Sequence, residues 1–119
     1  PEPDRLDLVA IDCEMCVTAQ GPELTRATVI SGSGGVLYDE LVKPYNEITK
    51  YLTHVSGITE EMLKPVTKRL PDIQRDLQQL LHADTVLVGH SLENDLQALR
   101  LAHPHVLDTS VLYGNPKVP

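Results

Sequence analysis

The sequence predicts an α/β fold built on a sheet with mixed strand directions. The first third of the chain reads as three strands joined by turns, and the second half alternates short buried strands with amphipathic helices. With 119 residues the chain is long enough for one domain and too short for two, so we expect a single domain over residues 1–119.

Three strands are expected first, in the order of a meander. Residues 6–11 form an apolar run with one Asp, which is typical of a central strand, and residues 24–30 carry several β-branched side chains. The Ser-Gly-Ser-Gly-Gly segment at residues 31–35 predicts a turn, so residues 36–42 should return beside the second strand as a hairpin. Pro44 is expected to end that third strand.

Helical spacing begins after the meander. Residues 46–51 are expected to form a short helix. Thr59 is a candidate N-cap for a second helix, with Glu60 and Glu61 in its first turn, where the helix dipole favours negative charge. Leucine and isoleucine side chains at helical spacing then predict a longer helix over residues 70–81.

Strand and helix alternate in the last part of the chain. Residues 85–89 predict a short buried strand, Ser91 can cap a helix that continues through Leu101, and residues 106–107 lead a last short strand. One face of the predicted helix carries Leu92, Leu96 and Leu99.

The bulk composition is that of an ordinary soluble globular domain. Hydrophobic residues make up 41% and charged residues 23%, and the net charge of −7 argues against a simple basic groove for nucleic acid. The acidic residues are either a solvated surface or, in part, a cluster that holds divalent cations. No apolar run approaches the roughly 18 residues of a membrane span, and residues 1–5 lack the features of a signal peptide. Because Pro1 is not an initiator Met, we expect a domain cut from a longer protein.

Cys13 and Cys16 have the C-x-x-C spacing of half a zinc site or of a redox pair. The chain has no second pair to complete a zinc site, and a redox pair usually sits at a helix N-terminus, whereas this pair interrupts an apparent strand. Buried, small, apolar side chains are the favoured interpretation.

Asp12 and Glu14 stand at the end of the first predicted strand. Because strand side chains alternate, both point to one face while Cys13 points to the other. Two carboxylates at this spacing repel each other unless a cation or a proton lies between them. The alternative is that the strand has already ended and that both side chains are solvated.

Asp95 lies at the edge of the apolar stripe of its predicted helix rather than on the polar face. A charged group in that position needs a partner. One possibility is that Asp95 belongs to a cation site. The alternative is that its carboxylate is bonded to nearby backbone or paired with Arg26 or Arg100.

Two motifs and four shorter segments resemble the DEDD (DnaQ-like) 3′→5′ exonuclease superfamily, in its eukaryotic Rex-type RNA exonuclease branch. Residues 9–15, Val-Ala-Ile-Asp-Cys-Glu-Met, are similar to the first motif, an apolar-Asp-x-Glu pattern at a strand end. Residues 89–96, Gly-His-Ser-Leu-Glu-Asn-Asp-Leu, resemble the second, in which G-H-x-x-x-x-D opens a helix. The shorter segments follow the order of that branch, at residues 23–26, 42–44, 54–59 and 107–110. The likeness spans residues 8–113 and implies an RNase H-like fold.

The resemblance also implies a site. Asp12, Glu14 and Asp95 would bind two Mg²⁺ or Mn²⁺ ions, for which oxygen ligands are suited. The terminal nucleotide would be held by Met15, Leu24 and His54. For His54, a structural hydrogen bond within its loop is an open alternative.

Two further candidates are expected to be structural: His90, bracing the turn before the helix, and Asp108, at the last strand. The superfamily needs a third motif, a His (or Tyr) followed by a fourth Asp. After Tyr113 this chain has only Gly-Asn-Pro-Lys-Val-Pro, which contains neither. We therefore expect a C-terminally incomplete domain that is inactive or nearly so, with a sheet face covered by a partner or by self-association.

The expected function is that of the N-terminal part of a metal-dependent 3′→5′ RNA exonuclease. It would release nucleoside 5′-monophosphates from the 3′ end of single-stranded RNA by two-metal phosphodiester hydrolysis. The Rex-type resemblance implies a nuclear location. The alternative is a non-catalytic module of the same fold that binds a nucleotide or a nucleic-acid end.

Overall fold

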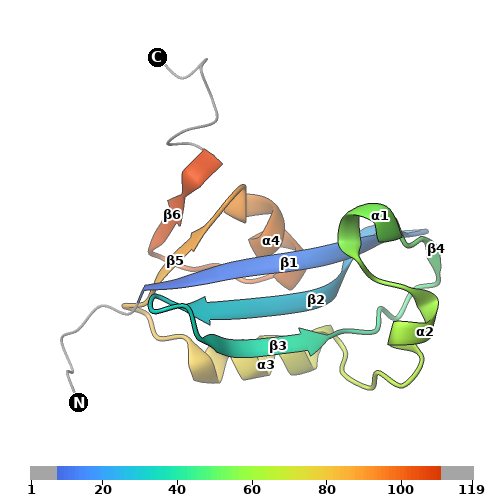
Figure 1. Ribbon diagram of the computed structural model, residues 1–119, viewed down its shortest axis with the longest axis horizontal. Helices are drawn as coiled ribbons and strands as arrows, with labels where there is room; N and C mark the ends of the chain where they lie inside the picture. Colours follow the sequence, from blue (N-terminus) through green and yellow to red (C-terminus); the bar gives the residue numbers. More distant parts are fainter. Residues whose placement is uncertain (1–7, 111–119) are drawn as a thin grey trace.

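A six-stranded mixed sheet organises the computed structural model, which describes residues 8–110 (Figure 1). The strand order is β3-β2-β1-β5-β6, with β4 paired to β1 off this path. The predicted α/β fold with a mixed sheet is confirmed. The elements in chain order are β1 (Leu8–Thr18), β2 (Gly21–Ser31), β3 (Val36–Leu41), β4 (Ile48–Lys50), α1 (Thr53–Ser56), α2 (Glu60–Leu63), α3 (Leu70–Leu80), β5 (Val86–Gly89), α4 (Leu92–Leu99) and β6 (Val106–Asp108).

The meander predicted for the first three strands is confirmed. β1, β2 and β3 pair antiparallel in sequence order, whereas β5 pairs parallel to β1 and β6 parallel to β5. The glycine-rich segment forms the turn between β2 and β3, closed by the backbone bond from Ser31 N to Gly35 O at 2.8 Å. Gly34 has a φ of 100°, a conformation that side chains rarely adopt.

β1 is longer than the sequence indicates. It continues to Thr18 instead of ending at Ile11, because β2 pairs with it from Val9 to Thr18. Asp12 and Glu14 therefore lie inside a strand and not at its end, and Cys13 does not interrupt it. The beginning of the predicted strand, at Leu6 and Asp7, lies outside the described residues.

The short helix predicted over residues 46–51 is wrong. This segment contains β4, which pairs antiparallel with the end of β1, with Lys50 opposite Val17. Pairing satisfies backbone groups at an edge that the long β1 would otherwise leave open. The next prediction is confirmed, since the Thr59 side chain accepts a hydrogen bond from Met62 N at 3.2 Å at the start of α2.

The main core lies between the sheet and two helices, α3 and α4. The predicted long helix is confirmed as α3, which begins after Arg69, whose backbone N–H donates to the Asp72 carboxylate at 2.9 Å. Apolar side chains of β1 and β2 meet those of both helices in this core, whose buried members are Val9, Ile11, Cys13, Leu24, Ala27, Val29, Val42, Ile73, Leu77, Leu87, Leu92 and Leu99.

A second, smaller core contains Cys16 together with Ile58 and Leu63 from the α1–α2 region. Cys13 and Cys16 are both buried, so their interpretation as apolar packing groups is confirmed. They belong to separate clusters, one against α3 and α4 and the other against α1 and α2. Because the two side chains pack into different clusters, the C-x-x-C spacing does not bring the two thiols to one shared site.

α4 differs from its prediction at both ends. Ser91 occupies the N-cap position, but its side chain makes no capping bond; instead the Asp108 carboxylate accepts from the backbone N–H groups of Ser91 and Leu92 at 2.8 and 2.9 Å. The helix ends at Leu99 and not at Leu101, since Arg100 adopts a left-handed conformation with a φ of 55°. Within residues 8–110, no helix has the length and apolar character needed to cross a membrane.

Candidate active site

Asp12 and Glu14 share one face of β1, opposite Thr28 and Arg26 of β2. The register then shifts by one residue, so that Thr25 is an extra residue in β2, a β-bulge. The Thr25 hydroxyl donates to the Glu14 carbonyl oxygen at 3.1 Å and fixes the bulge. The sequence carries no signal for this bulge beyond a β-branched polar residue inside a strand.

The other edge of β1 is paired at both ends and open in the middle. β5 pairs with β1 as far as Ala10, and β4 pairs with it from Val17 onward. The backbone between these points has no strand neighbour on that side. α4 lies along this gap, and the carboxylate of Asp95 accepts a hydrogen bond from the backbone N–H of Cys13. The gap thereby places a helix carboxylate beside the two strand carboxylates.

Glu14 and Asp95 both lie close enough to Asp12 for its charge to raise their pKa values. Asp95 is only 7% exposed, and burial, with the charge of Asp12 next in importance, raises its pKa to about 6, although the Cys13 N–H opposes the shift. Burial and the Asp12 charge also raise the pKa of Glu14 above its ordinary value. The Cys13 thiol is held protonated, since burial and all three carboxylates raise its pKa. A cation bound here would relieve this repulsion.

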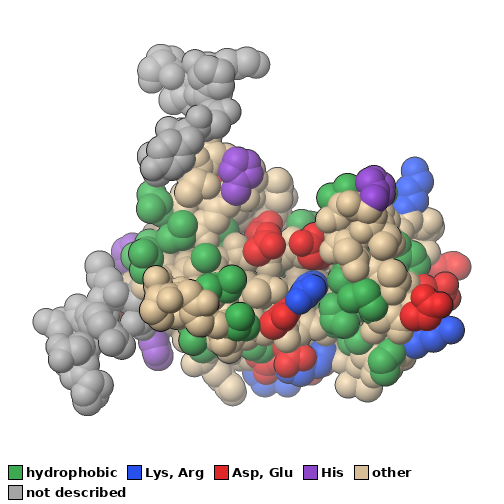
Figure 2. Space-filling model, in the orientation of Figure 1, with side chains coloured by type: hydrophobic (Ala, Val, Ile, Leu, Met, Phe, Trp, Pro, Cys, Tyr) green, Lys and Arg blue, Asp and Glu red, His purple; other side chains and the backbone are tan. Residues whose placement is uncertain are grey.

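Arg26 is the basic side chain beside these carboxylates, and it is engaged elsewhere. Its guanidinium donates two hydrogen bonds to Asp39, at 2.9 and 2.7 Å. Of the partners considered for Asp95, the backbone bond is found, and among the described residues a pairing with Arg26 or Arg100 is not. Figure 2 shows acidic side chains gathered in the middle of the face over β1, with a basic side chain beside them.

The donor chemistry of this site suits a hard divalent cation, because Asp12, Glu14 and Asp95 offer only oxygen ligands. The side chains are not drawn together as a finished ligand set: within residues 8–110, no three His, Cys, Asp or Glu side chains converge tightly enough to hold a metal ion. The role of these carboxylates as metal ligands therefore stays a prediction.

The predicted nucleotide-binding residues occupy three different environments. Met15 is partly buried and pairs with Leu24, which is 3% exposed and belongs to the main core. Both side chains point to the sheet face opposite Glu14, because Met15 is the next residue along β1 and Leu24 is its partner in β2. His54 lies exposed on α1 and makes no side-chain hydrogen bond to any described residue, so the structure supplies no structural role for it. Their contact with a nucleotide stays a prediction.

Asp108 is structural, as expected. Its carboxylate accepts from the Ser110 hydroxyl at 2.7 Å and from the two backbone groups that begin α4, and these bonds lower its pKa. His90 is exposed and its side chain makes no hydrogen bond within the described residues, so the predicted bracing of the turn is not observed. The third motif would have to follow Ser110, outside the described residues.

The structure also contains a pocket that the sequence does not indicate. It has a volume of about 620 Å³, and its lining includes Leu24, Tyr45 and Arg100. The sequence gives no signal for it, because the pocket is assembled from segments far apart in the chain.

The chain matches a family model described as Exonuclease (RNase_T) over residues 9–107. It is 56% identical over 110 residues to RNA exonuclease 5 of Bos taurus and 54% identical over 110 residues to RNA exonuclease 5 of Homo sapiens. It is also 44% identical over 117 residues to RNA exonuclease 1 of Saccharomyces cerevisiae. These alignments cover 92%, 92% and 94% of this chain but only 14%, 14% and 21% of the relatives. The chain thus spans a small part of the length of the proteins it resembles.

Solved structures with the same fold include two Pan2 nucleases. The Neurospora crassa Pan2 catalytic unit superimposes with a TM-score of 0.82 at 27% identity, covering 99% of this chain and 21% of that one. The Saccharomyces cerevisiae Pan2 exonuclease module in complex with A7 RNA gives 0.82 at 28% identity, covering 97% and 22%. Together with the family match and the curated relatives, they show that the chain belongs to the Exonuclease (RNase_T) family, in the Rex-type branch of the DEDD 3′→5′ exonucleases.

Proposed function

We propose that this chain carries the carboxylates of the first two motifs of a metal-dependent 3′→5′ RNA exonuclease, which removes nucleoside 5′-monophosphates from single-stranded RNA. The observation that supports this most directly is the buried carboxylate of Asp95, which is bonded to Cys13 N–H beside Asp12 and Glu14. A carboxylate kept in this position at a cost in repulsion is typical of a site built for a cation.

In this proposal Asp12, Glu14 and Asp95 hold Mg²⁺ or Mn²⁺. The bound ions would supply a hydroxide nucleophile and stabilise the leaving 3′ oxygen. The protein's own part is to fix the ligands. The Cys13 N–H orients the Asp95 carboxylate, and Asp108 anchors the helix that carries it. Carboxylates held by backbone donors reorganise less when charge develops in the reaction.

RNA is the proposed substrate because the curated relatives are named RNA exonucleases and because Pan2 structures contain RNA such as AAGGA and A7. The net charge of −7 means that bound cations, rather than a basic groove, would meet the phosphates at the cleavage point. The 3′→5′ direction and a nuclear location are carried over from the Rex-type branch. Residues 1–119 are proposed to hydrolyse RNA slowly or not at all, because they lack the His and Asp of the third motif.

The test compares this chain with a version extended through a third motif. Both are given 5′-labelled RNA with Mg²⁺ or Mn²⁺, and products are separated by length. A ladder that shortens from the 3′ end with the extended version, and that Asp12→Asn abolishes, supports the proposal. Asp84→Asn is the matched control, since Asp84 is an exposed loop carboxylate outside the site. Products cut from the 5′ end, or a ladder unchanged by Asp12→Asn, would contradict it.

A second candidate function is a non-catalytic module that binds nucleic-acid ends. It is favoured by the lack of a finished three-ligand metal cluster within residues 8–110. Binding of metal or RNA by both versions, without cleavage by either, would select this second function.

A further inference from the structure

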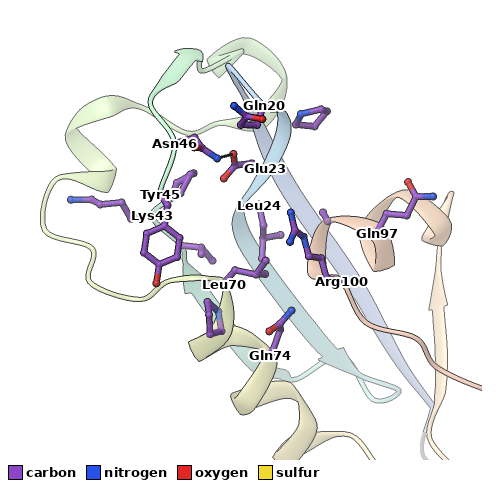
Figure 3. A pocket seen from close by; sticks show the side chains of 15 residues that line it. Gln20, Glu23, Leu24, Lys43, Tyr45, Asn46, Leu70, Gln74, Gln97 and Arg100 are labelled. Carbon is purple, nitrogen blue, oxygen red and sulfur yellow. Dashed lines mark hydrogen bonds between the residues drawn. The ribbon is translucent and has the colours of Figure 1, made fainter.

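A pocket of about 620 Å³ lies on the sheet face opposite Asp12 and Glu14 (Figure 3). It is bounded by the beginning of β2, the segment after β3, the first turn of α3 and the end of α4. Leu24 forms part of its floor, and the lining includes none of the three candidate metal-binding carboxylates. The pocket therefore does not include the proposed metal ligands, and Leu24 is the residue that it shares with the predicted nucleotide-binding set.

Arg100 gives this pocket an available positive charge. It follows α4 in the left-handed conformation, with its backbone N–H bonded to Gln97 O at 3.0 Å. Figure 3 shows its side chain projecting from the end of the helix toward Leu24. Among residues 8–110, its guanidinium makes neither a hydrogen bond nor an ion pair, so it is free to bind an anion.

The other charged groups of the lining are already engaged. The Lys43 amine donates to Lys64 O at 3.0 Å, on the far side of its own segment. The Glu23 carboxylate accepts from the Thr18 hydroxyl at 2.8 Å and from the Asn46 amide at 2.5 Å. Arg100 is thus the lining group whose charge an incoming anion would meet first.

Tyr45 gives the pocket an open aromatic surface. It is 71% exposed, which is unusual for a ring of this size, and the guanidinium of Arg69 lies 4.8 Å from its centroid. Arg69 is itself held by hydrogen bonds to the carbonyl oxygens of Lys43 and Pro44, at 3.1 and 2.8 Å. The ring is backed on one side and open on the other, which suits stacking of a nucleobase.

We propose that this pocket binds an upstream nucleotide of the single-stranded RNA whose 3′ end lies at the carboxylates, with the base on Tyr45 and a phosphate at Arg100. The inference rests on the proposed function. α4 connects the two places, because Asp95 borders the carboxylate site and Arg100 follows it by five positions, or ~7.5 Å along a helix. Because the two sites lie on opposite faces of the sheet, an RNA strand that occupies both would pass around the C-terminal end of α4.

The test measures affinity for two RNA probes by fluorescence anisotropy, with Ca²⁺ replacing Mg²⁺ to slow cleavage. One probe is a dinucleotide and the other is an oligouridylate of about eight nucleotides, within the usual site sizes for single strands. Arg100→Gln and Tyr45→Ala change side chains that are exposed or free, so folding should be retained. Arg75→Gln is the matched control, since Arg75 is exposed on α3 and does not line the pocket.

Each pocket variant should weaken binding of the longer probe by roughly 5-fold or more while leaving the dinucleotide unaffected. Arg100→Gln should also reduce the slope of log affinity against log salt by about 0.7, the value for one phosphate contact on a single strand. Unchanged affinity for the longer probe, or an equal loss with Arg75→Gln, overturns the pocket assignment alone. Failure of the unsubstituted chain to bind either probe overturns the proposed RNA substrate as well.

Discussion

The carboxylate of Asp95 accepts a hydrogen bond from the backbone N–H of Cys13, in the stretch of β1 that neither β4 nor β5 covers. This bond joins a helix side chain to a strand backbone at the place where the sheet has lost a neighbour. It satisfies a backbone donor and at the same time holds a third carboxylate beside Asp12 and Glu14. This one hydrogen bond thus contributes both to the fold and to the geometry of the candidate site.

Asp95→Asn should stabilise the protein in the absence of divalent cations. The pKa of Asp95 is raised to about 6, so folding favours its neutral form and opposes its charged form. That penalty is fully present above about pH 6 and disappears as both states become protonated below about pH 4. Asn mimics the neutral form and can still accept from Cys13 N–H.

The expected gain at about pH 7.5 is on the order of 1 kcal/mol, discounted for partial solvent screening, and it should shrink toward zero near pH 4. Urea unfolding of both proteins in EDTA across this range measures the difference. Asp84→Asn, at an exposed position, should show no such pH-dependent gain. A variant that is less stable than the unsubstituted chain at about pH 7.5 would contradict the assignment of Asp95 as a destabilised carboxylate.

Divalent cations should reverse this order of stability. Binding of Mg²⁺ or Mn²⁺ to the folded state alone would stabilise the unsubstituted chain by about 2.7 kcal/mol at a concentration 100 times Kd. Thermal unfolding should show a rise in Tm for the unsubstituted chain and little or none for Asp12→Asn or Asp95→Asn. Should Asp12→Asn keep the full rise, the cation binds somewhere other than the candidate site.

The candidate site residues could be predicted from the sequence because their signals are local. The D-x-E spacing on a strand and the edge position of Asp95 on an apolar helix face each point to a carboxylate that needs a partner. What brings them together was not predictable, because it depends on pairing. The open gap in β1 arises from the lengths of β4 and β5 and from the register of each, and the helix predicted over residues 46–51 hid the first of these strands.

The cap of α4 shows the same limit. Ser91 has the residue type and the position of an N-cap, yet Asp108 makes the bonds from a different strand. The left-handed conformation of Ser91, with a φ of 56°, is not the extended conformation that an N-cap residue normally adopts, and its side chain makes no capping bond. Likewise, Tyr45 and Arg100 line a common pocket only because β2, the segment after β3, α3 and α4 are assembled around it. Such long-range contacts leave no pattern in a single sequence.

Thr25→Val should destabilise the protein by about 1–2 kcal/mol, since it removes the hydrogen bond from the buried Thr25 hydroxyl to the Glu14 carbonyl oxygen at nearly constant volume. In the extended, active version it should also lower kcat, because the bulge sets the position of Glu14. Thr49→Val is the matched control: its hydroxyl also donates to a β1 carbonyl, Val17 O at 3.1 Å, but at an exposed site. Urea unfolding should show a clearly smaller loss for that control, and equal losses would remove the special role given to the bulge.

Gly89→Ala should displace α4 and with it Asp95. A Cβ at Gly89 would lie 2.7 Å from Leu92 Cδ2 and 3.0 Å from the backbone oxygen of Ile11, so β5 and α4 could no longer pack as closely against β1. Overpacking of this kind costs about 1–3 kcal/mol. Gly35→Ala is the control, since its Cβ would meet only the Ser31 hydroxyl oxygen at an ordinary 3.5 Å. Gly89→Ala should lower the Tm and abolish the cation-dependent rise in Tm. Gly35→Ala should do neither. A Gly89→Ala protein that keeps both would show that close packing at this glycine does not position the Asp95 carboxylate.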